Sequence, residues 1–220
     1  MSSRQLVLTF HGLGEPPRPV DAGEAECWVP LDWFEAVVDV ARRDADVAIT
    51  FDDGNASDLD EALPRLERAG AEATFFVLAG KFGGPGYLDA PGARRLRSAG
   101  MAVGSHGLHH RDWRAADDDE LGAEVRESSR QLAELLGEPV DMAAVPFGSY
   151  DRRVLKVAHG TYRKVFTSDG GPSRPDDWLV PRTTIHTGRP LDHWVDLVAG
   201  WRRSGPDLKR SAKRLAKRWR

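Results

Sequence analysis

Cysteine and long apolar runs are scarce in this sequence, and each scarcity excludes a class of protein. Cys27 is the only cysteine among 220 residues, so no intramolecular disulfide can form and a disulfide-stabilised scaffold is excluded. We expect Cys27 to be an ordinary buried or surface thiol. No stretch approaches the roughly 20 apolar residues of a membrane helix, and the apolar run at residues 6–10 is too short for a signal peptide. The sequence therefore predicts a soluble, cytoplasmic protein.

Neither sign of charge is in large excess. The formal net charge is −3, with 30% charged and 40% hydrophobic residues, which is typical of a folded globular chain. The length suits a single α/β barrel, and no linker-like segment divides it. We predict one domain over residues 1–205, followed by a short tail over residues 206–220.

The tail (residues 206–220) differs in composition from the rest of the chain. From residue 208 onward it carries seven Lys or Arg residues, no acidic residue, and apolar residues at helical spacing. Such a helix either docks on the domain with its basic face in solvent, which we expect, or contacts an anionic membrane as a peripheral element. Nucleic-acid binding is not expected, because the remainder of the chain is acidic.

Short apolar runs alternate with amphipathic segments along the chain. The runs predict strands at residues 6–10, 47–51, 73–78, 101–104, 140–145, 164–167 and 178–185. The segments between and after them predict helices at residues 31–42, 59–69, 93–99, 118–136, 152–158 and 193–200. This alternation predicts parallel strands joined by helical crossovers, arranged either as an open doubly wound sheet or as a barrel.

The first polar cluster, Thr50-Phe51-Asp52-Asp53-Gly54, ends a predicted strand. Successive side chains of a strand point to opposite faces, so the two carboxylates point in different directions. One can bind a metal ion while its neighbour acts as a base. Taken alone, the motif is equally typical of a tight turn.

Three histidines, His106, His109 and His110, follow the predicted strand at residues 101–104. The chain has only seven histidines, so three within five positions are difficult to assign to packing. His106 and His110 are four residues apart, and a loop or helical turn can present both imidazoles to one ion such as zinc. His109 either faces away or holds a carboxylate behind the ligands. We predict a metal site, with a surface histidine cluster as the alternative.

A third cluster, Pro146-Phe147-Gly148, follows the predicted strand at residues 140–145. A rigid turn at a strand end can direct a backbone N–H toward an oxyanion. By itself, the cluster is interpreted more simply as a structural turn.

Together the three clusters resemble the motifs of the polysaccharide deacetylase family, also called carbohydrate esterase family four. The similarity covers most of the chain, from about residue 5 to about residue 190. It implies a distorted (β/α) barrel of about seven parallel strands, acting on an N-acetylated carbohydrate with a divalent metal ion. Zinc is the expected ion, with cobalt, nickel and manganese as alternatives. By the same resemblance, Asp53, His106 and His110 hold the metal.

The resemblance also assigns roles in catalysis. Asp52 matches the general base of the family, and the N–H of Phe147, in the turn that Pro146 begins, matches a donor to the oxyanion. The arginine of the family's third motif is replaced by Ala144, and Arg182 near the last predicted strand is the substitute we expect. The general acid has no clear counterpart.

Two histidines are alternatives for the general acid. His186 follows the last predicted strand and His11 follows the first. A histidine at the carboxyl end of a barrel strand faces the site. Either residue is equally well explained as an ordinary loop histidine.

The sequence thus predicts a hydrolase that removes N-acetyl groups from a polysaccharide, an oligosaccharide or a sugar-lipid. One alternative is a metal-dependent hydrolase of a non-sugar amide on the same fold. Another is a carbohydrate-binding homologue that lacks activity. The intact carboxylate and histidine set favours an enzyme, because a binding protein needs no base beside a set of metal ligands.

Overall fold

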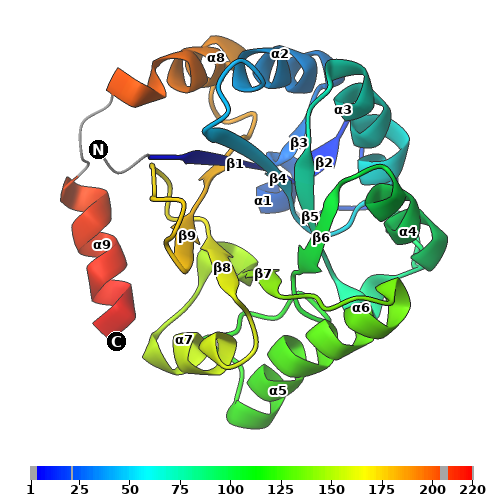
Figure 1. Ribbon diagram of the computed structural model, residues 1–220, viewed down its shortest axis with the longest axis vertical. Helices are drawn as coiled ribbons and strands as arrows, with labels where there is room; N and C mark the ends of the chain where they lie inside the picture. The colour runs from blue at the N-terminus through cyan, green and yellow to red at the C-terminus, as the bar shows by residue number, and fades with distance from the viewer. Residues whose placement is uncertain (1–3, 21, 204–207, 220) are drawn as a thin grey trace.

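The computed structural model describes residues 4–20, 22–203 and 208–219, and its centre is a barrel of parallel strands ringed by helices (Figure 1). Eight strands pair in the order β10-β1-β4-β5-β6-β7-β8-β9, and every pair is parallel. They are β1 (Leu6–Phe10), β4 (Val47–Phe51), β5 (Ala73–Val77), β6 (Ala102–Ser105), β7 (Met142–Ala144), β8 (Lys164–Thr167), β9 (Leu179–Pro181) and β10 (Thr183–Thr184). The predicted distorted (β/α) barrel is confirmed.

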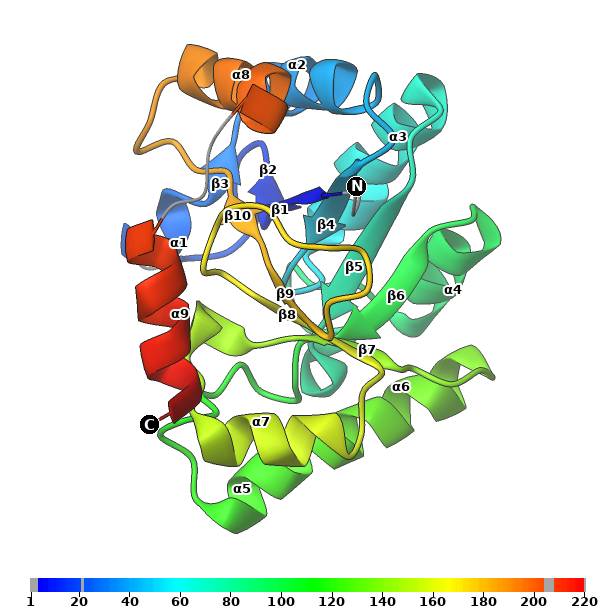
Figure 2. The same cartoon turned by 60° about the vertical axis from the view of Figure 1, so that its left-hand side comes forward.

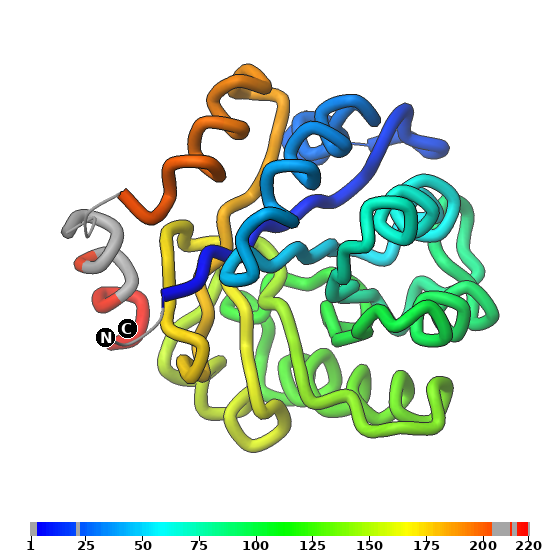
Figure 3. The backbone as a smooth tube through the Cα atoms, turned by 45° about the horizontal axis from the view of Figure 1, so that its top comes forward, coloured from blue at the N-terminus to red at the C-terminus, as the bar shows by residue number. Residues whose placement is uncertain are grey.

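One short segment of chain nearly closes the barrel. β9 pairs with β8, β10 pairs with β1, and Arg182 alone stands between β9 and β10. In Figure 3 this yellow-to-orange segment lies beside the blue β1. The single strand predicted at residues 178–185 is divided here because its two halves pair with different neighbours.

The helices follow the predicted alternation closely. They are α2 (Leu31–Ala41), α3 (Leu63–Ala69), α4 (Ala90–Ser98), α5 (Asp118–Gly122), α6 (Ser128–Leu136), α7 (Arg152–His159) and α8 (Leu191–Gly200), with 3-10 turns at Ala79–Lys81, Pro146–Gly148 and Trp201–Arg203. A π-helical stretch joins α5 to α6, and another precedes α3, so two predicted helices are continuous but locally widened. The prediction lacks α1 (Ala22–Ala25) and the strand pair β2 (Gly12–Leu13) and β3 (Trp28–Val29), because such short elements show no period.

Capping side chains and glycines set several helix boundaries. Asp89, Asp117 and Asp151 each accept a hydrogen bond from a backbone N–H in the first turn of α4, α5 and α7. These bonds satisfy donors that the helix itself leaves unpaired. Gly70 and Gly137 end α3 and α6 in the left-handed conformation, which glycine adopts at little cost.

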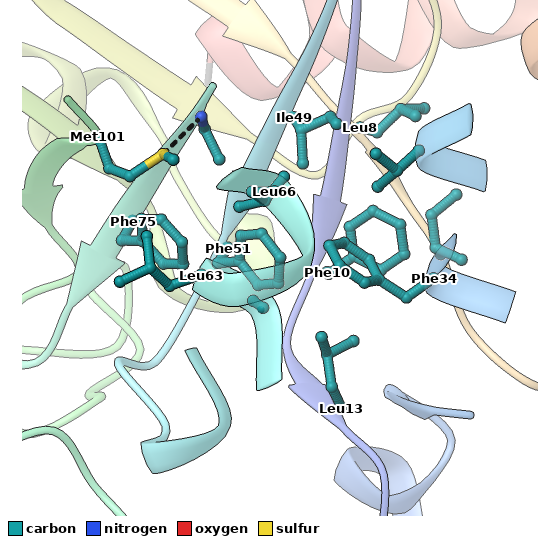
Figure 4. Close-up of a cluster of buried hydrophobic side chains, with 14 of the residues drawn as sticks. Leu8, Phe10, Leu13, Phe34, Ile49, Phe51, Leu63, Leu66, Phe75 and Met101 are labelled. Carbon is teal, nitrogen blue, oxygen red and sulfur yellow. Dashed lines mark hydrogen bonds between the residues drawn. The ribbon is translucent and has the colours of Figure 1, made fainter. Parts of the chain in front are cut away.

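Most of the core lies between the barrel wall and the surrounding helices. Figure 4 shows Phe10, Phe51 and Phe75 on neighbouring strands, with Phe34 of α2 against Phe10. The rings of Phe51 and Phe75 stack with their centroids 4.7 Å apart. All four rings are fully buried, and each such burial contributes roughly 1.5–3 kcal/mol.

A smaller set of side chains fills the inside of the barrel. It consists of Val7, Phe76, Ala144, Phe166 and Val180. Because strand side chains alternate between faces, Phe51 points out toward the helices while Thr50 and Asp52 point inward. The strand pattern therefore places the carboxylate of Asp52 in the mouth of the barrel.

The last helix, α9 (Leu208–Trp219), stands outside the ring of helices, with its C-terminal end beside α7 (Figure 2). It occupies most of the predicted tail, of which residues 206, 207 and 220 lie outside the described residues. Within the ranges given above, no helix is both long enough and apolar enough to cross a membrane. The domain boundary at residue 205 and the cytoplasmic location stay predictions.

Candidate active site

A cleft of about 360 Å³ opens where the barrel strands end. Side chains from the loops after β1, β4, β5, β6, β7 and β8 converge there, as expected at the carboxyl face of a parallel barrel. The lining residues are His11, Arg18, Gly23, Glu24, Cys27, Asp52, Asp53, Leu78, Tyr87, His106, His110, Phe147 and Ser168. A larger hollow of about 540 Å³ lies at the amino ends of β4, β5 and β6, but no predicted site residue lines it.

Asp52 forms a two-pronged salt bridge with Arg182 in the barrel mouth. The two terminal nitrogens of Arg182 each donate to one oxygen of Asp52 at 2.6 Å. Arg182 Nη1 also donates to the hydroxyls of Thr9 and Thr50 at 3.1 Å. The guanidinium lies 5.2 Å from the ring centroid of Phe76 and is fully buried. The structure thus brings Arg182 to the carboxylate that the third-motif arginine was expected to orient.

The charge of Arg182 decides the ionisation state of Asp52. Burial alone would raise the pKa of Asp52, but the guanidinium of Arg182 holds this pKa well below its usual range. Breaking such a buried pair from one side is strongly unfavourable, because a charge is left without a partner. Asp52 is therefore an ionised carboxylate in one fixed orientation.

Asp53, His106 and His110 converge on one point beside Asp52. Asp53 Oδ1 lies 3.5 Å from Nε2 of each histidine, and the three ligand atoms lie within 4.8 Å of one another. Asp53 Oδ1 is buried and has no hydrogen-bond partner among the described residues. A buried oxygen that accepts no hydrogen bond is rare. One carboxylate and two imidazoles form a ligand set that zinc and similar ions bind. The three residues therefore fit a divalent metal ion.

The orientation of His106 also suits a metal ligand. Its Nδ1 lies 2.9 Å from the carbonyl oxygen of Ala144, which accepts the ring proton and leaves the Nε2 lone pair directed at Asp53. Burial lowers the pKa of His106 to about 4, against the raising effect of Asp52 and Asp53. The imidazole is neutral at physiological pH, as metal binding requires.

Glu124 supports the histidine loop from behind. Its buried carboxylate accepts hydrogen bonds from the backbone N–H of Leu108 at 2.8 Å and of His109 at 3.0 Å. The His109 ring packs against Gly80 and does not line the cleft. Glu124 lies on the same helix face as Leu121, so an acidic residue within an apolar stripe was the signal that could have identified it.

Three residues of the site have a left-handed backbone. Asp53, His110 and Phe147 have φ angles of 76°, 59° and 57°, and elsewhere in the described ranges positive φ occurs only at glycine. This conformation costs a non-glycine residue about 1–2 kcal/mol. Such strain concentrates at functional sites, where it directs side chains that regular structure would point elsewhere.

The two alternatives for the general acid lie in different places. His11 lines the cleft, and its Nε2 is 4.0 Å from Asp52 Oδ2. The His186 ring lies against Trp194, with centroids 5.1 Å apart, and His186 does not line the cleft. Of the two, only His11 is within reach of a group bound beside Asp52.

The Pro146–Gly148 turn forms part of the cleft rim. Pro146 is buried, whereas the Phe147 side chain is 65% exposed. The Phe147 ring lies against His110, with centroids 4.4 Å apart. The turn therefore places an aromatic surface next to a metal-ligand candidate.

The loop between β1 and α2 contributes a wall of the cleft, as the long segment after the first predicted strand allows. Arg18 forms a salt bridge with Glu24, and its guanidinium lies 4.7 Å from the ring centroid of Tyr87. Arg18 and Glu24 belong to this same loop, whereas Tyr87 lies between β5 and α4, so no short pattern joins Tyr87 to the other two. Cys27 lies nearby, and burial raises the pKa of its thiol to about 11. It is an ordinary protonated thiol, as expected.

A further carboxyl group, that of Asp58, is fully buried near the site. Neither of its oxygens has a hydrogen-bond partner within the part of the chain that the structure describes. Burial, and then repulsion from Asp53 and Asp52, raise the pKa of Asp58 well above its usual value. The sequence places it directly after the aspartate motif but gives no sign of its burial.

Comparison with known proteins identifies the family. The model of the Polysaccharide deacetylase family matches residues 39–164, which is more than half of the chain. This chain belongs to the polysaccharide deacetylase family. The matched segment contains Asp52, Asp53, His106, His110 and Phe147, whereas Arg182 and His11 lie outside it.

Curated relatives agree with this membership. The putative polysaccharide deacetylase YxkH of Bacillus subtilis is 25% identical over 134 residues, which are 60% of this chain and 48% of that protein. The chitooligosaccharide deacetylase of Rhizobium leguminosarum bv. trifolii is 27% identical over 180 residues, which are 80% of this chain and 73% of that protein. The match thus spans about half the length of the first relative and most of the second.

Solved structures share the fold. A Streptococcus pyogenes deacetylase, PplD, determined in complex with acetate, aligns with a TM-score of 0.75 and 20% identity, covering 89% of this chain and 98% of that chain. A polysaccharide deacetylase from Bacillus cereus aligns with a TM-score of 0.77 and 20% identity, covering 90% of this chain and 69% of that chain. At these identities the likeness establishes the barrel architecture alone.

Proposed function

We propose that this chain is a metal-dependent hydrolase that removes N-acetyl groups from a sugar, giving a free amine and acetate. One observation carries the proposal: an ionised, oriented carboxylate, Asp52, lies directly beside the Asp53–His106–His110 cluster. Family membership and the names of the relatives, which are polysaccharide and chitooligosaccharide deacetylases, support an acetylated carbohydrate as substrate.

Asp53, His106 and His110 would hold the metal ion. When bound, a divalent ion at these ligands supplies Lewis-acid chemistry, polarising a carbonyl group and increasing the acidity of water. The imidazole of His106 is neutral, and Oδ1 of Asp53 accepts no hydrogen bond from the described residues, so both atoms are available to such an ion.

Asp52 would act as the general base. Arg182 occupies one side of its carboxylate and fixes the plane of the group, so the oxygens keep a constant direction toward the cleft. The base takes a proton from the attacking water while the water oxygen bonds to the acetyl carbonyl carbon. Positioned proton transfer of this kind contributes about 10²–10⁴-fold to a rate.

The Phe147 turn would serve both the reaction and the substrate. The backbone N–H of Phe147 donates to the oxyanion that forms as the carbonyl carbon becomes tetrahedral. The exposed Phe147 ring at the cleft rim offers an apolar face of the kind that stacks on sugar rings.

His11 would complete the reaction as general acid. The C–N bond breaks as the leaving nitrogen receives a proton, and acetate departs with the new C–O bond. The position of His11 in the cleft favours it over His186, which packs on Trp194.

The inactive-homologue alternative loses its main argument here. It rests on Ala144 standing where the family has an arginine and on the unassigned general acid, and Arg182 answers the first point by supplying a guanidinium to Asp52. The non-sugar amide alternative is separated by substrate choice, because the reacting residues would be the same.

The test is acetate release from N-acetylglucosamine oligomers with added zinc or cobalt. We expect activity in the wild type and its loss in Asp52→Asn, with metal content unchanged. Asp60→Asn, an exposed aspartate on the same segment, is the matched control and should retain full activity. Absence of release from every acetylated sugar, with metal bound, would contradict the proposal, and activity on a non-sugar amide would then favour the alternative.

A second pair of variants tests the acid. We expect His11→Ala to lower kcat by about 100-fold or more, and His186→Ala to change it by less than about three-fold. Equal effects of the two substitutions would contradict the assignment of His11.

A further inference from the structure

The α9 helix presents an apolar strip to solvent. Ala212, Leu215, Ala216 and Trp219 are all exposed, at the spacing that places them along one side of a helix. Leu215 is 57% exposed and Trp219 is 75% exposed. Single exposed apolar residues need no explanation, but a strip of this kind along a helix does.

A salt bridge on the other side of α9 sets this orientation. Lys217 Nζ donates to the carbonyl oxygen of Gly148 at 2.9 Å and to Asp169 Oδ1 at 2.6 Å. Asp169 is held in turn by the hydroxyl groups of Tyr150 and Thr167. Lys217 points toward the barrel domain. Leu215 and Trp219, two positions before and after it on the helix, therefore point away from the domain into solvent.

The exposed large apolar side chains of the described residues are Phe147, Leu215 and Trp219, and all three belong to two joined segments. Phe147 precedes Gly148, whose carbonyl oxygen binds Lys217, so the Pro146–Gly148 turn and α9 are in direct contact. The exposed large apolar side chains of the described residues are therefore concentrated in the cleft-rim turn and α9. In Figure 1, α9 is separated from α3 and α4 by the whole width of the barrel.

The charge of this segment is opposite to that of the remaining chain. From residue 208 to the end there are seven Lys or Arg residues and no acidic residue, whereas the whole chain has a net charge of −3. An anionic surface would attract this segment and repel the remainder, which gives a single favoured orientation. Helices with an apolar strip and basic flanks lie in the plane of a lipid interface.

We propose that α9 binds an anionic lipid surface, with Leu215 and Trp219 inserted among the acyl chains and the exposed Arg218 at the level of the headgroups. A nucleic acid would use the charge but leave the apolar strip in water, and a second copy of the basic helix would repel the first. The bilayer is the occupant that uses both properties.

The experiment measures flotation of the full-length protein with vesicles. Vesicles of phosphatidylcholine alone are compared with vesicles of equal parts phosphatidylcholine and phosphatidylglycerol. We expect binding to the anionic vesicles only, weakened by raising the salt from about 0.1 M to about 0.5 M because salt screens exposed charges. No binding to the anionic vesicles would overturn the proposal.

Two variants show which residues carry the binding. Leu215→Ser with Trp219→Ser should weaken vesicle binding by about ten-fold or more, since two large apolar side chains no longer enter the interface. Arg218→Glu should weaken it, whereas Arg68→Glu, the same charge change on exposed α3, should weaken it much less. Vesicle binding by the double serine variant equal to wild type would overturn the proposal.

Two further results would also overturn it. One is binding to double-stranded DNA at least as strong as to anionic vesicles and unchanged in the double serine variant. The other is a concentration-dependent dimer in sedimentation, abolished by the same variant, without vesicle binding. Thermal unfolding checks that each variant is folded, and because vesicle binding requires no turnover, its outcome is independent of the proposed deacetylase activity.

Discussion

Asp52 and Asp53 are neighbours in the sequence but occupy opposite environments. Both oxygens of Asp52 accept hydrogen bonds from one buried guanidinium, whereas Asp53 Oδ1 faces two imidazole nitrogens and no donor among the described residues. The difference begins in the backbone, because Asp52 continues the strand and Asp53 leaves it with a φ of 76°. The protein itself supplies a guanidinium to one carboxylate, whereas Oδ1 of the other has no hydrogen-bond donor among the described residues.

The largest effect is expected from removing the carboxylate that lacks a protein donor. Asp53→Ala deletes one of the three proposed metal ligands, and we expect acetate release to fall by more than about 100-fold. This loss exceeds the one expected when a residue that only hydrogen-bonds to a ligand is replaced. The matching loss of zinc is measured on the dialysed protein by elemental analysis. A variant that retained stoichiometric zinc would contradict the ligand assignment. Chelation of the wild type should reproduce the loss of activity, and added zinc should restore it.

The next effect concerns the carboxylate that the protein neutralises. Arg182→Met leaves Asp52 buried without a partner, which should lower the free energy of unfolding by about 3–5 kcal/mol, measured with urea. The double variant Asp52→Asn/Arg182→Met should recover a large part of this loss, because no charge is then left alone. If Arg182→Met lowers the free energy of unfolding by less than about 1 kcal/mol, the value expected for an exposed ion pair, the Asp52–Arg182 pair is not a buried salt bridge.

Asp58 sharpens the comparison, because it is a buried carboxyl with neither a guanidinium nor a metal cluster. Its pKa is raised in the fold, so the unfolded chain loses this proton near pH 4 while the folded chain keeps it to higher pH. Stability is therefore lost as pH rises through that window. Asp58→Asn cannot titrate, and its stability relative to wild type should grow with pH by about 1.4 kcal/mol per unit across the window.

Urea unfolding of the metal-free proteins at pH 4.5 and pH 7.5 provides the measurement for Asp58. The gain of Asp58→Asn over wild type should be larger at the higher pH. Asp60→Asn, an exposed neighbour, should show no such trend. An equal difference at both pH values would mean that Asp58 is not the titrating group.

The smallest effect is expected at the rim, where hydrogen bonds position the Phe147 turn. Lys217→Met removes the contacts to Gly148 and Asp169, and we expect kcat/KM to fall about two- to five-fold, mostly through KM. Arg218→Met, the exposed neighbour on the same helix, is the control and should leave kcat/KM of a soluble substrate unchanged. A large fall in kcat with unchanged KM would place Lys217 nearer to the chemistry.

Local patterns allowed much of the fold and part of the site to be predicted. The seven apolar runs correspond to barrel strands because parallel strands buried on both faces are continuously apolar. Asp52, Asp53, His106 and His110 were identifiable because each set lies within a few residues at one strand end. These are short-range features, visible without knowing how the chain closes.

The remaining features depend on contacts between distant segments. Arg182 and Asp52 are 130 positions apart, so the sequence suggested the arginine only as a substitute and could not show its two-pronged geometry. Lys217 meets Gly148 from a separate helix, and no pattern within either segment indicates the other. The left-handed backbone at His110 and Phe147 was equally hidden, because only glycine makes that conformation visible in a sequence.

The position of Arg182 between β9 and β10 links the assembly of the fold to its reactivity. The residue at which the chain passes from one barrel edge to the other is also the residue that neutralises Asp52. Local opening of the pairing between β10 and β1, on the timescale reported by amide hydrogen exchange, would remove Arg182 from the Asp52 carboxylate. The rest of the domain would stay folded. Under the proposed function, the base is oriented only while β10 pairs with β1 and Arg182 stands against Asp52.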